Sequence, residues 1–70
     1  MKFLIIDDHA IVRKGLSQLL KEEFPDSEIV EATDEYEVYQ KTRSQIWDVI
    51  LKSFLLKATL QITLGKRFRG

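Results

Sequence analysis

Apolar runs and helical stripes alternate along the first part of this chain. Residues 2–6 form a continuous apolar run that ends at Asp7 and Asp8, which is typical of a strand buried on both faces. Pro25 cannot continue a helix, so the helix after this strand should end near Phe24. Its apolar face is predicted by residues that recur at helical spacing: Val12, Leu16, Leu19 and Leu20.

The same succession follows a second time. Residues 28–32 hold a short apolar pair between acids, which predicts an edge strand whose charges face water. Asp34 and Glu37 have the spacing of a capping box and predict a helix from there to about Ser44. A third apolar run begins at Asp48 and predicts a third strand.

This order of elements predicts the fold class. Strands that alternate with helices through short connections form parallel sheets with right-handed crossovers. We therefore expect an α/β half-domain over residues 1–51 with a parallel sheet of order 2-1-3, which is the first part of a flavodoxin-like fold.

The tail, residues 52–70, has two interpretations. Leu60, Ile62 and Leu64 alternate with polar residues, as in a half-buried strand. A helical stripe also fits, formed by Leu51, Phe54, Leu55, Ala58 and Ile62. The threonine and isoleucine content favours the extended form, which could add a strand to the sheet.

Composition narrows the class of protein. The 70 residues include no cysteine, so disulfides and thiolate metal sites are excluded. No apolar run approaches the roughly 20 residues of a membrane span, and acids follow the start too soon for a signal peptide, so we expect a cytoplasmic protein without a membrane partner.

The net charge of zero hides an asymmetry between the two parts of the chain. Residues 1–51 carry six basic and eleven acidic residues, a net charge of −5. Residues 52–70 carry five basic residues and no acidic one, a net charge of +5. A basic tail can bind nucleic acid, but these charges are sparse, so a plain solvated tail is favoured.

Asp7 and Asp8 are the strongest candidates for chemistry. They follow the first strand, and ligands of open α/β sheets bind at the carboxyl ends of strands where the strand order reverses. A divalent cation such as Mg²⁺ would relieve the repulsion between the two carboxylates. The alternative is that one acid caps the following helix while the other is solvated.

Other residues that invite a functional interpretation are explained more simply. His9 is interpreted as a loop residue at the head of the helix instead of a catalytic base. Tyr36, Tyr39 and Trp47 are interpreted as packing residues instead of a binding box.

A resemblance to a known family adds to these interpretations. Residues 6–16, Ile-Asp-Asp-His-Ala-Ile-Val-Arg-Lys-Gly-Leu, resemble the opening of response-regulator receiver domains of two-component systems, above all those joined to a LuxR-type output domain. The resemblance continues through the dipeptides at 25–26, 31–32 and 34–35 and ends with residues 47–51. It implies a five-stranded parallel sheet, a histidine kinase as partner, and phosphoryl transfer to an aspartate at the end of the third strand beside Mg²⁺.

Carried over by position, the resemblance gives roles to residues of the site. Asp8 would bind Mg²⁺ directly, Asp7 would act through a water, and the backbone carbonyl of Leu55 would complete the site. Lys52 and Ser53 stand where the family has an apolar residue and the phosphoacceptor aspartate. A serine hydroxyl is a poor nucleophile without an adjacent base. We therefore expect a non-enzyme that is not phosphorylated and that holds Mg²⁺ weakly, if at all.

Nothing after Leu51 resembles the later strands of a receiver, so we expect a receiver truncated after its third strand. Its exposed sheet edge is a template for pairing, so we expect the chain to cover that edge either with its own tail, folded back as an added strand, or with another copy in a homodimer or higher oligomer. The favoured function is a degenerate receiver, followed by a self-associating module and then by a nucleic-acid binder.

Overall fold

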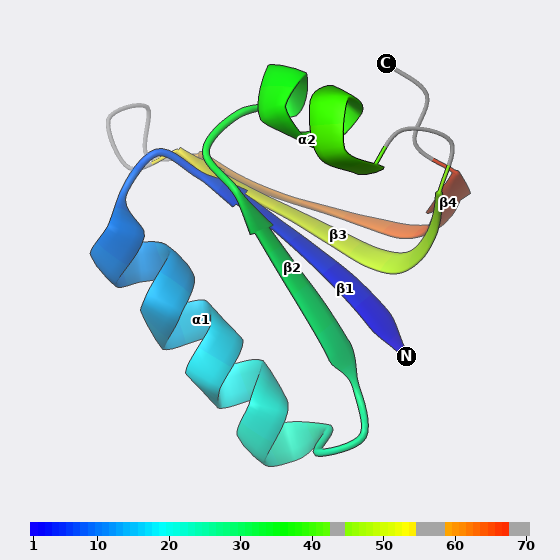
Figure 1. The fold of residues 1–70 in the computed structure, drawn as a ribbon. Coiled ribbons are helices and arrows are strands. Elements are labelled where there is room, and N and C mark those ends of the chain that lie inside the picture. Colours follow the sequence, from blue (N-terminus) through cyan, green and yellow to red (C-terminus); the bar gives the residue numbers. More distant parts are fainter. Residues whose placement is uncertain (43–44, 55–58, 68–70) are drawn as a thin grey trace.

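The structure of the protein, a computed structural model, describes residues 1–42, 45–54 and 59–67. Figure 1 shows its elements in chain order: β1 (Lys2–Asp7), α1 (Ala10–Glu23), β2 (Glu28–Ala32), α2 (Glu35–Thr42), β3 (Ile46–Phe54) and β4 (Thr59–Arg67). The predicted alternation of strand and helix is confirmed. β3 begins before the expected Asp48, and the expected helix end at Ser44 lies outside the described residues.

The sheet has four strands in the order β2-β1-β3-β4. β1 pairs in parallel with β2 and with β3, so the predicted 2-1-3 arrangement forms the first three positions. The prediction of a purely parallel sheet is wrong, because β4 pairs antiparallel with β3. Phe54 and Thr59 are paired across the two strands, whereas a parallel neighbour would need a crossover of roughly a dozen residues.

The tail therefore adds a strand, as its alternating pattern indicated, and the helical alternative is wrong for residues 59–67. Gly65 within β4 has a φ of 58°, a left-handed conformation that glycine adopts without steric cost. β3 itself continues to Phe54, so the change of charge and of resemblance near residue 51 falls inside a strand. The division into a half-domain and a tail stays a prediction.

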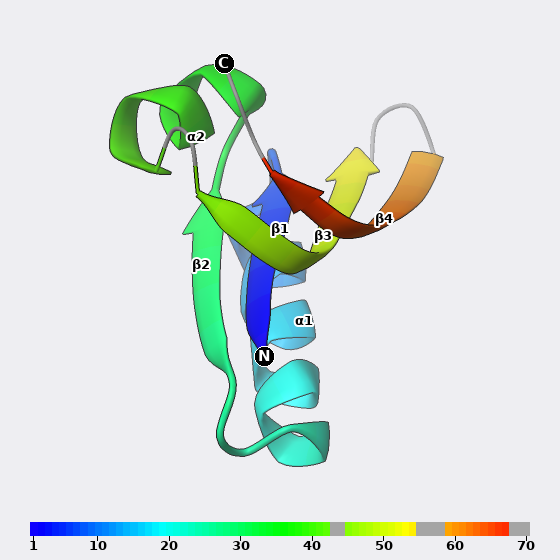
Figure 2. The ribbon, with the colours of Figure 1, turned by 90° about the vertical axis from the view of Figure 1, so that its right-hand side faces the viewer.

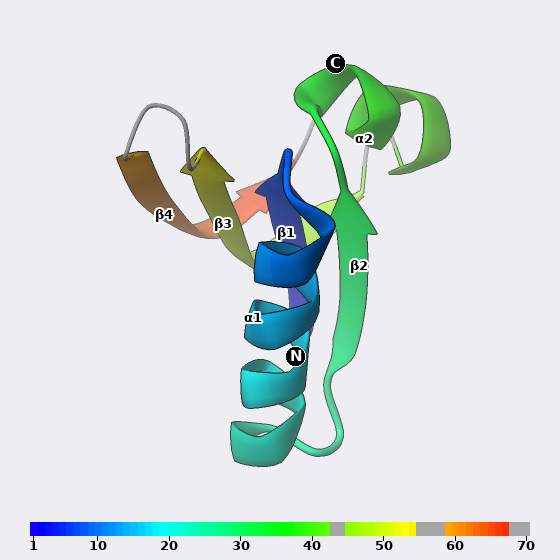
Figure 3. The same ribbon diagram turned by 90° about the vertical axis from the view of Figure 1, so that its left-hand side faces the viewer.

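The two helices cover opposite faces of the sheet (Figures 2 and 3). α1 lies behind the strands in Figure 2 and in front of β1 and β2 in Figure 3, and β4 lies beyond its cover. β1 is buried from Phe3 to Asp7, as predicted for a strand covered on both faces. On the α1 face, the rings of Phe3 and Phe24 lie with centroids 5.4 Å apart, so the residue that ends α1 packs on the central strand.

The main core lies between α2 and the sheet. Trp47 is fully buried there, and the ammonium of Lys2 lies 4.9 Å from its ring centroid. The cluster is apolar throughout and consists of Leu4, Ile6, Ala32, Val38, Trp47 and Ile50. Trp47 is thus a packing residue, as predicted.

Two packing predictions are wrong. Tyr36 is 70% exposed, because it lies in the first turn of α2 on the side away from the core. Leu19, assigned to the buried face of α1, is 56% exposed, and no residue of α1 is fully buried. A single helix over two strands leaves part of an apolar stripe uncovered.

The predicted capping box opens α2. The amide of Glu37 donates to Asp34 Oδ1 at 2.8 Å. The return bond runs from the amide of Thr33, one residue before the N-cap, to Glu37 Oε1 at 2.9 Å. This cap fixes the start of α2 immediately after the edge strand β2.

Candidate metal centre at the end of strand β1

The candidate site lies where β1 ends and the chain turns into α1. Asp7 is the last residue of β1, and Asp8 and His9 connect it to α1. On the neighbouring strand β3, the Cα partner of Asp7 is Ser53. Register partners in parallel strands point to the same face, so the half-buried Ser53 lies beside Asp7.

Asp7 is fully buried, which is unusual for a carboxylate. Its Oδ1 accepts a hydrogen bond from the amide of His9 at 2.6 Å. Its Oδ2 is buried and has no hydrogen-bond partner among the described residues. Because an unsatisfied buried oxygen costs free energy, a bound cation suits this position.

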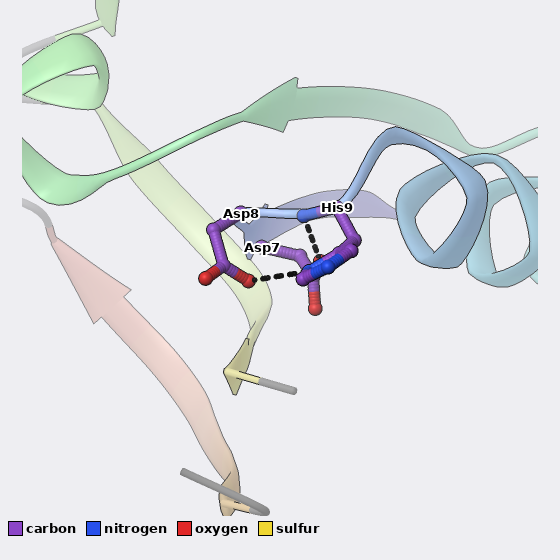
Figure 4. Close-up of side chains that lie close together, drawn as sticks. All are labelled: Asp7, Asp8 and His9. Atoms are coloured by element: carbon purple, nitrogen blue, oxygen red, sulfur yellow. Dashed lines mark hydrogen bonds and ion pairs between the residues drawn. The ribbon is translucent and has the colours of Figure 1, made fainter. Parts of the chain in front are cut away.

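Asp8 and His9 complete a cluster with Asp7. His9 Nδ1 lies 3.1 Å from Asp8 Oδ1, and the two side chains are 43% and 37% exposed respectively. One ligand atom from each of the three residues can be chosen so that all lie within 4.8 Å of one another. Figure 4 shows the Asp8 carboxylate and the imidazole of His9 turned toward each other beside Asp7.

The alternative interpretation, in which one acid caps α1 and the other is solvated, is confirmed only in part. His9 takes the N-cap position of α1, and its side chain makes no capping hydrogen bond. Asp7 accepts the His9 amide, which lies just outside the first helical turn, and Asp8 is exposed. Local backbone bonding therefore accounts for one oxygen of Asp7 and leaves the other without a partner.

Arg13 fixes the site to the surrounding elements. From α1, its Nη1 donates to the backbone oxygen of Asp7 at 2.7 Å, and its Nε lies 3.5 Å from Glu31 Oε1 on β2. The side chain is only 17% exposed, so these contacts are poorly screened by water. The end of β1 is thereby held against both α1 and β2.

Lys52 and Ser53 point to opposite faces of β3. Lys52 pairs with Glu35 in the first turn of α2, on the face away from Asp7. This ion pair explains how a lysine is accommodated in a strand expected to be buried. Leu55, whose carbonyl the resemblance places at the metal, lies outside the described residues.

His9 is the residue whose role the sequence pattern did not predict. It is a loop residue at the head of α1, as interpreted, but its ring nitrogen also lies within the acidic cluster. The only signal for this in the sequence is its place directly after the two acids.

An acidic pair lies at the carboxyl end of the first strand of this α/β sheet, an arrangement that the resemblance to receivers implies. Comparison with known proteins agrees with it: the oxygen regulatory protein NreC of Staphylococcus aureus strains JH9, JH1 and Mu3 is 41% identical to this chain over 51 residues. The match covers 73% of this chain and 24% of NreC, so the chain spans about a quarter of that relative. The similarity supports a relationship to response-regulator receivers.

No family model matches the chain, and no solved structure matches it. Among the described residues, neither helix has the length and apolar character needed to cross a bilayer.

Proposed function

We propose that this chain is a degenerate response-regulator receiver of a two-component system that is not phosphorylated on aspartate. The observation that carries the proposal is the pairing of Asp7 with Ser53 in the register of β1 and β3. If the chain is aligned with receivers without a gap, the residue beside the acidic pair is the phosphoacceptor position. A hydroxyl stands there in place of a carboxylate.

The chemistry of the site supports this proposal. Phosphoryl transfer to a receiver needs a carboxylate nucleophile with Mg²⁺ alongside, and among the described residues no titratable base forms a hydrogen bond with the Ser53 hydroxyl. Asp7 and Asp8 would still hold Mg²⁺, whose role in receivers is to neutralise phosphoryl charge. With one carboxylate fewer, Mg²⁺ is held weakly and mostly through water. The chain would then be a cytoplasmic non-enzyme that retains a receiver-like surface, with a histidine kinase as its ancestral partner.

Beryllofluoride tests the proposal, because it mimics a phosphoryl group only on an acceptor carboxylate. Amide NMR spectra of the full chain are recorded during a Mg²⁺ titration, with and without beryllofluoride. We expect the two titrations to coincide. Shifts at the ends of β1 and β3 that require both Mg²⁺ and beryllofluoride would contradict the proposal.

A specific observation favours a second candidate function, which is self-association through the β4 edge. β2 and β4 are the two edge strands of the sheet, but β2 carries Glu28 and Glu31, which protect an edge from pairing. Residues 59–65 of β4 carry no charge. On its α1 face, Ile62 and Leu64 are 60% and 73% exposed.

A second copy suits this edge, because two β4 strands paired antiparallel about a two-fold axis would extend the sheet and place their apolar faces side by side on the same side of it. Sedimentation velocity over a range of concentrations tests this, with Leu64→Lys as the disrupting variant. Ile11→Lys, on α1, is the matched control, since Ile11 is 87% exposed. We expect a dimer that only Leu64→Lys dissociates. A folded monomer at every concentration would rule the candidate out.

The described residues add no support for nucleic-acid binding by the basic tail. Lys52 is paired with Glu35, and Lys57 and Arg69 lie outside the described residues. That interpretation stays the least supported of the three.

A further inference from the structure

We infer that the groove between α1 and β2 binds a small organic phosphate, in which the phosphate group is attached to an apolar body. The groove has a volume of about 680 Å³, which lies within the range of small-molecule pockets. None of its lining residues belongs to the acidic cluster at the end of β1. The inference therefore goes beyond the proposed function and does not depend on it.

The groove follows one side of α1. Lys14, Gln18 and Lys21 recur at spacings of four and three residues, so they share the side of the helix that borders β2. Figure 3 shows α1 and β2 running side by side there. The floor includes Ile29, whose Cα partner on β1 is Phe3. Since Phe3 packs on the ring that ends α1, Ile29 also points to the α1 face of the sheet.

Polar contacts hold both ends of the groove in place. Toward the end of β2, Glu31 lies 3.5 Å from Arg13 Nε and accepts a hydrogen bond from Ser17 Oγ at 3.0 Å. At the other end, Lys21 donates to the backbone oxygen of Ser27, whose side chain is buried. The acid that shares this face of β2 is thus already paired, and the walls of the groove are fixed to each other.

The groove contains positive charge that no acid compensates. In the described part of the chain, neither Lys14 nor Lys21 forms an ion pair. Glu28, the acid that lines the groove, lies 3.7 Å from Lys2 on β1. Lys21 uses one ammonium hydrogen on the backbone of Ser27, so both lysines keep donors for a ligand. An anion is the group that this groove lacks.

The lining determines the class of anion. Two ammonium groups suit a phosphate group, which carries roughly two negative charges at pH 7. Lys14 and Lys21 are separated by two helical turns, about 10.5 Å along the axis, which their flexible stems can close from both sides. The stems and the side chain of Ile29 offer apolar surface beside the charges. An apolar body attached to the phosphate would cover that surface, which inorganic phosphate leaves in water.

Phenyl phosphate is the probe, because it joins a phosphate group to an apolar ring. Amide NMR spectra of the full chain follow its titration at constant ionic strength and without divalent cations. Inorganic phosphate and phenol are titrated in parallel, since each supplies one half of the probe. Lys14→Gln is the test variant, because Lys14 is exposed and makes no hydrogen bond or ion pair within the described residues. Lys52→Gln is the matched control, since it removes the same charge from a lysine that pairs with α2.

We expect phenyl phosphate to shift the amides of residues 14–21 and 27–29 in a saturable way. Its dissociation constant should be at least fivefold lower than those of inorganic phosphate and phenol, because only the probe uses both the charge and the apolar surface. Lys14→Gln should weaken the probe by roughly fivefold, as expected for the loss of one exposed charge-assisted contact, and Lys52→Gln by less than twofold. Circular dichroism confirms that each variant is folded.

Three results would overturn the inference. The first is the absence of any saturable shift. The second is equal binding of phenyl phosphate and inorganic phosphate with no loss in Lys14→Gln, which would indicate general attraction of anions to basic residues. The third is phenol binding as tightly as the probe, which would indicate an apolar contact without an anion site. None of these results bears on phosphorylation, which the beryllofluoride titration decides separately.

Discussion

Replacing Ser53 with aspartate tests the arrangement of the site most sharply. Ser53 and Asp7 are Cα partners on adjacent parallel strands, so their side chains start about 4.8 Å apart on the same face. Two carboxylates separated by about 5 Å repel each other by roughly 3 kcal/mol at an effective dielectric constant of about 20, which suits a half-buried position. We expect Ser53→Asp to lower the free energy of unfolding by about 2–3 kcal/mol in the absence of divalent cations.

Mg²⁺ should reverse this loss, because it binds the folded three-carboxylate site and not the unfolded chain. At a free concentration about 100 times its dissociation constant, a ligand adds ~2.7 kcal/mol to the free energy of unfolding. Urea unfolding followed by circular dichroism, with and without saturating Mg²⁺, measures both effects. Ser53→Asn is the control, since an asparagine side chain has about the same size as the aspartate of Ser53→Asp but carries no charge.

If Ser53→Asp and Ser53→Asn unfold at the same urea concentration and neither responds to Mg²⁺, residue 53 does not face the acidic pair. The alignment of Ser53 with the acceptor position would then lose its structural support.

Two further predictions concern stability. Gly15→Ala should raise the free energy of unfolding by about 1 kcal/mol, because no heavy atom outside the local helix backbone lies within 4 Å of the added Cβ and glycine disfavours helix; unchanged or lower stability in urea would show that α1 does not hold a regular helix there. Trp47→Ala should cost about 3–5 kcal/mol, because it empties the core under α2. That loss is comparable to the whole stability expected for a small domain, so its amide spectrum should be that of a largely unfolded chain; a native-like spectrum would contradict the burial of Trp47.

The sequence predicted the part of the fold that local pattern controls. The end of α1 follows from Pro25. The bounds of β2 follow from the acids that flank its apolar pair, and the cap of α2 follows from Asp34 with Glu37. Each of these signals acts over a few residues. Double burial of β1 was also predictable, because its apolar run has no alternation.

Features that depend on distant partners were not predictable in the same way. The alternation in the tail favoured a strand, but its antiparallel pairing depends on the free edge of β3. Leu19 fits a helical stripe, yet it is exposed because the described part of the chain places no second helix beside α1. Lys52 was unexpected in a buried strand. Its pairing with Glu35, in the first turn of α2, accounts for it and could not be predicted from sequence.

The candidate site was likewise predictable in part from the local sequence. The acidic pair could be located from Asp7 and Asp8 and the end of an apolar run. The unpartnered oxygen of Asp7 and the approach of His9 to Asp8 depend on side-chain geometry at the turn into α1, and no sequence pattern reports that geometry.

The most direct test of the central claim is intact mass spectrometry of the full chain after incubation with acetyl phosphate and Mg²⁺. An ordinary receiver with its aspartate acceptor is treated in parallel to show that the phosphodonor is active. We predict that this chain keeps its unmodified mass. A hydroxylamine-sensitive gain of one phosphoryl group would show that an aspartate accepts phosphate, and the account of a receiver without acceptor chemistry would be wrong.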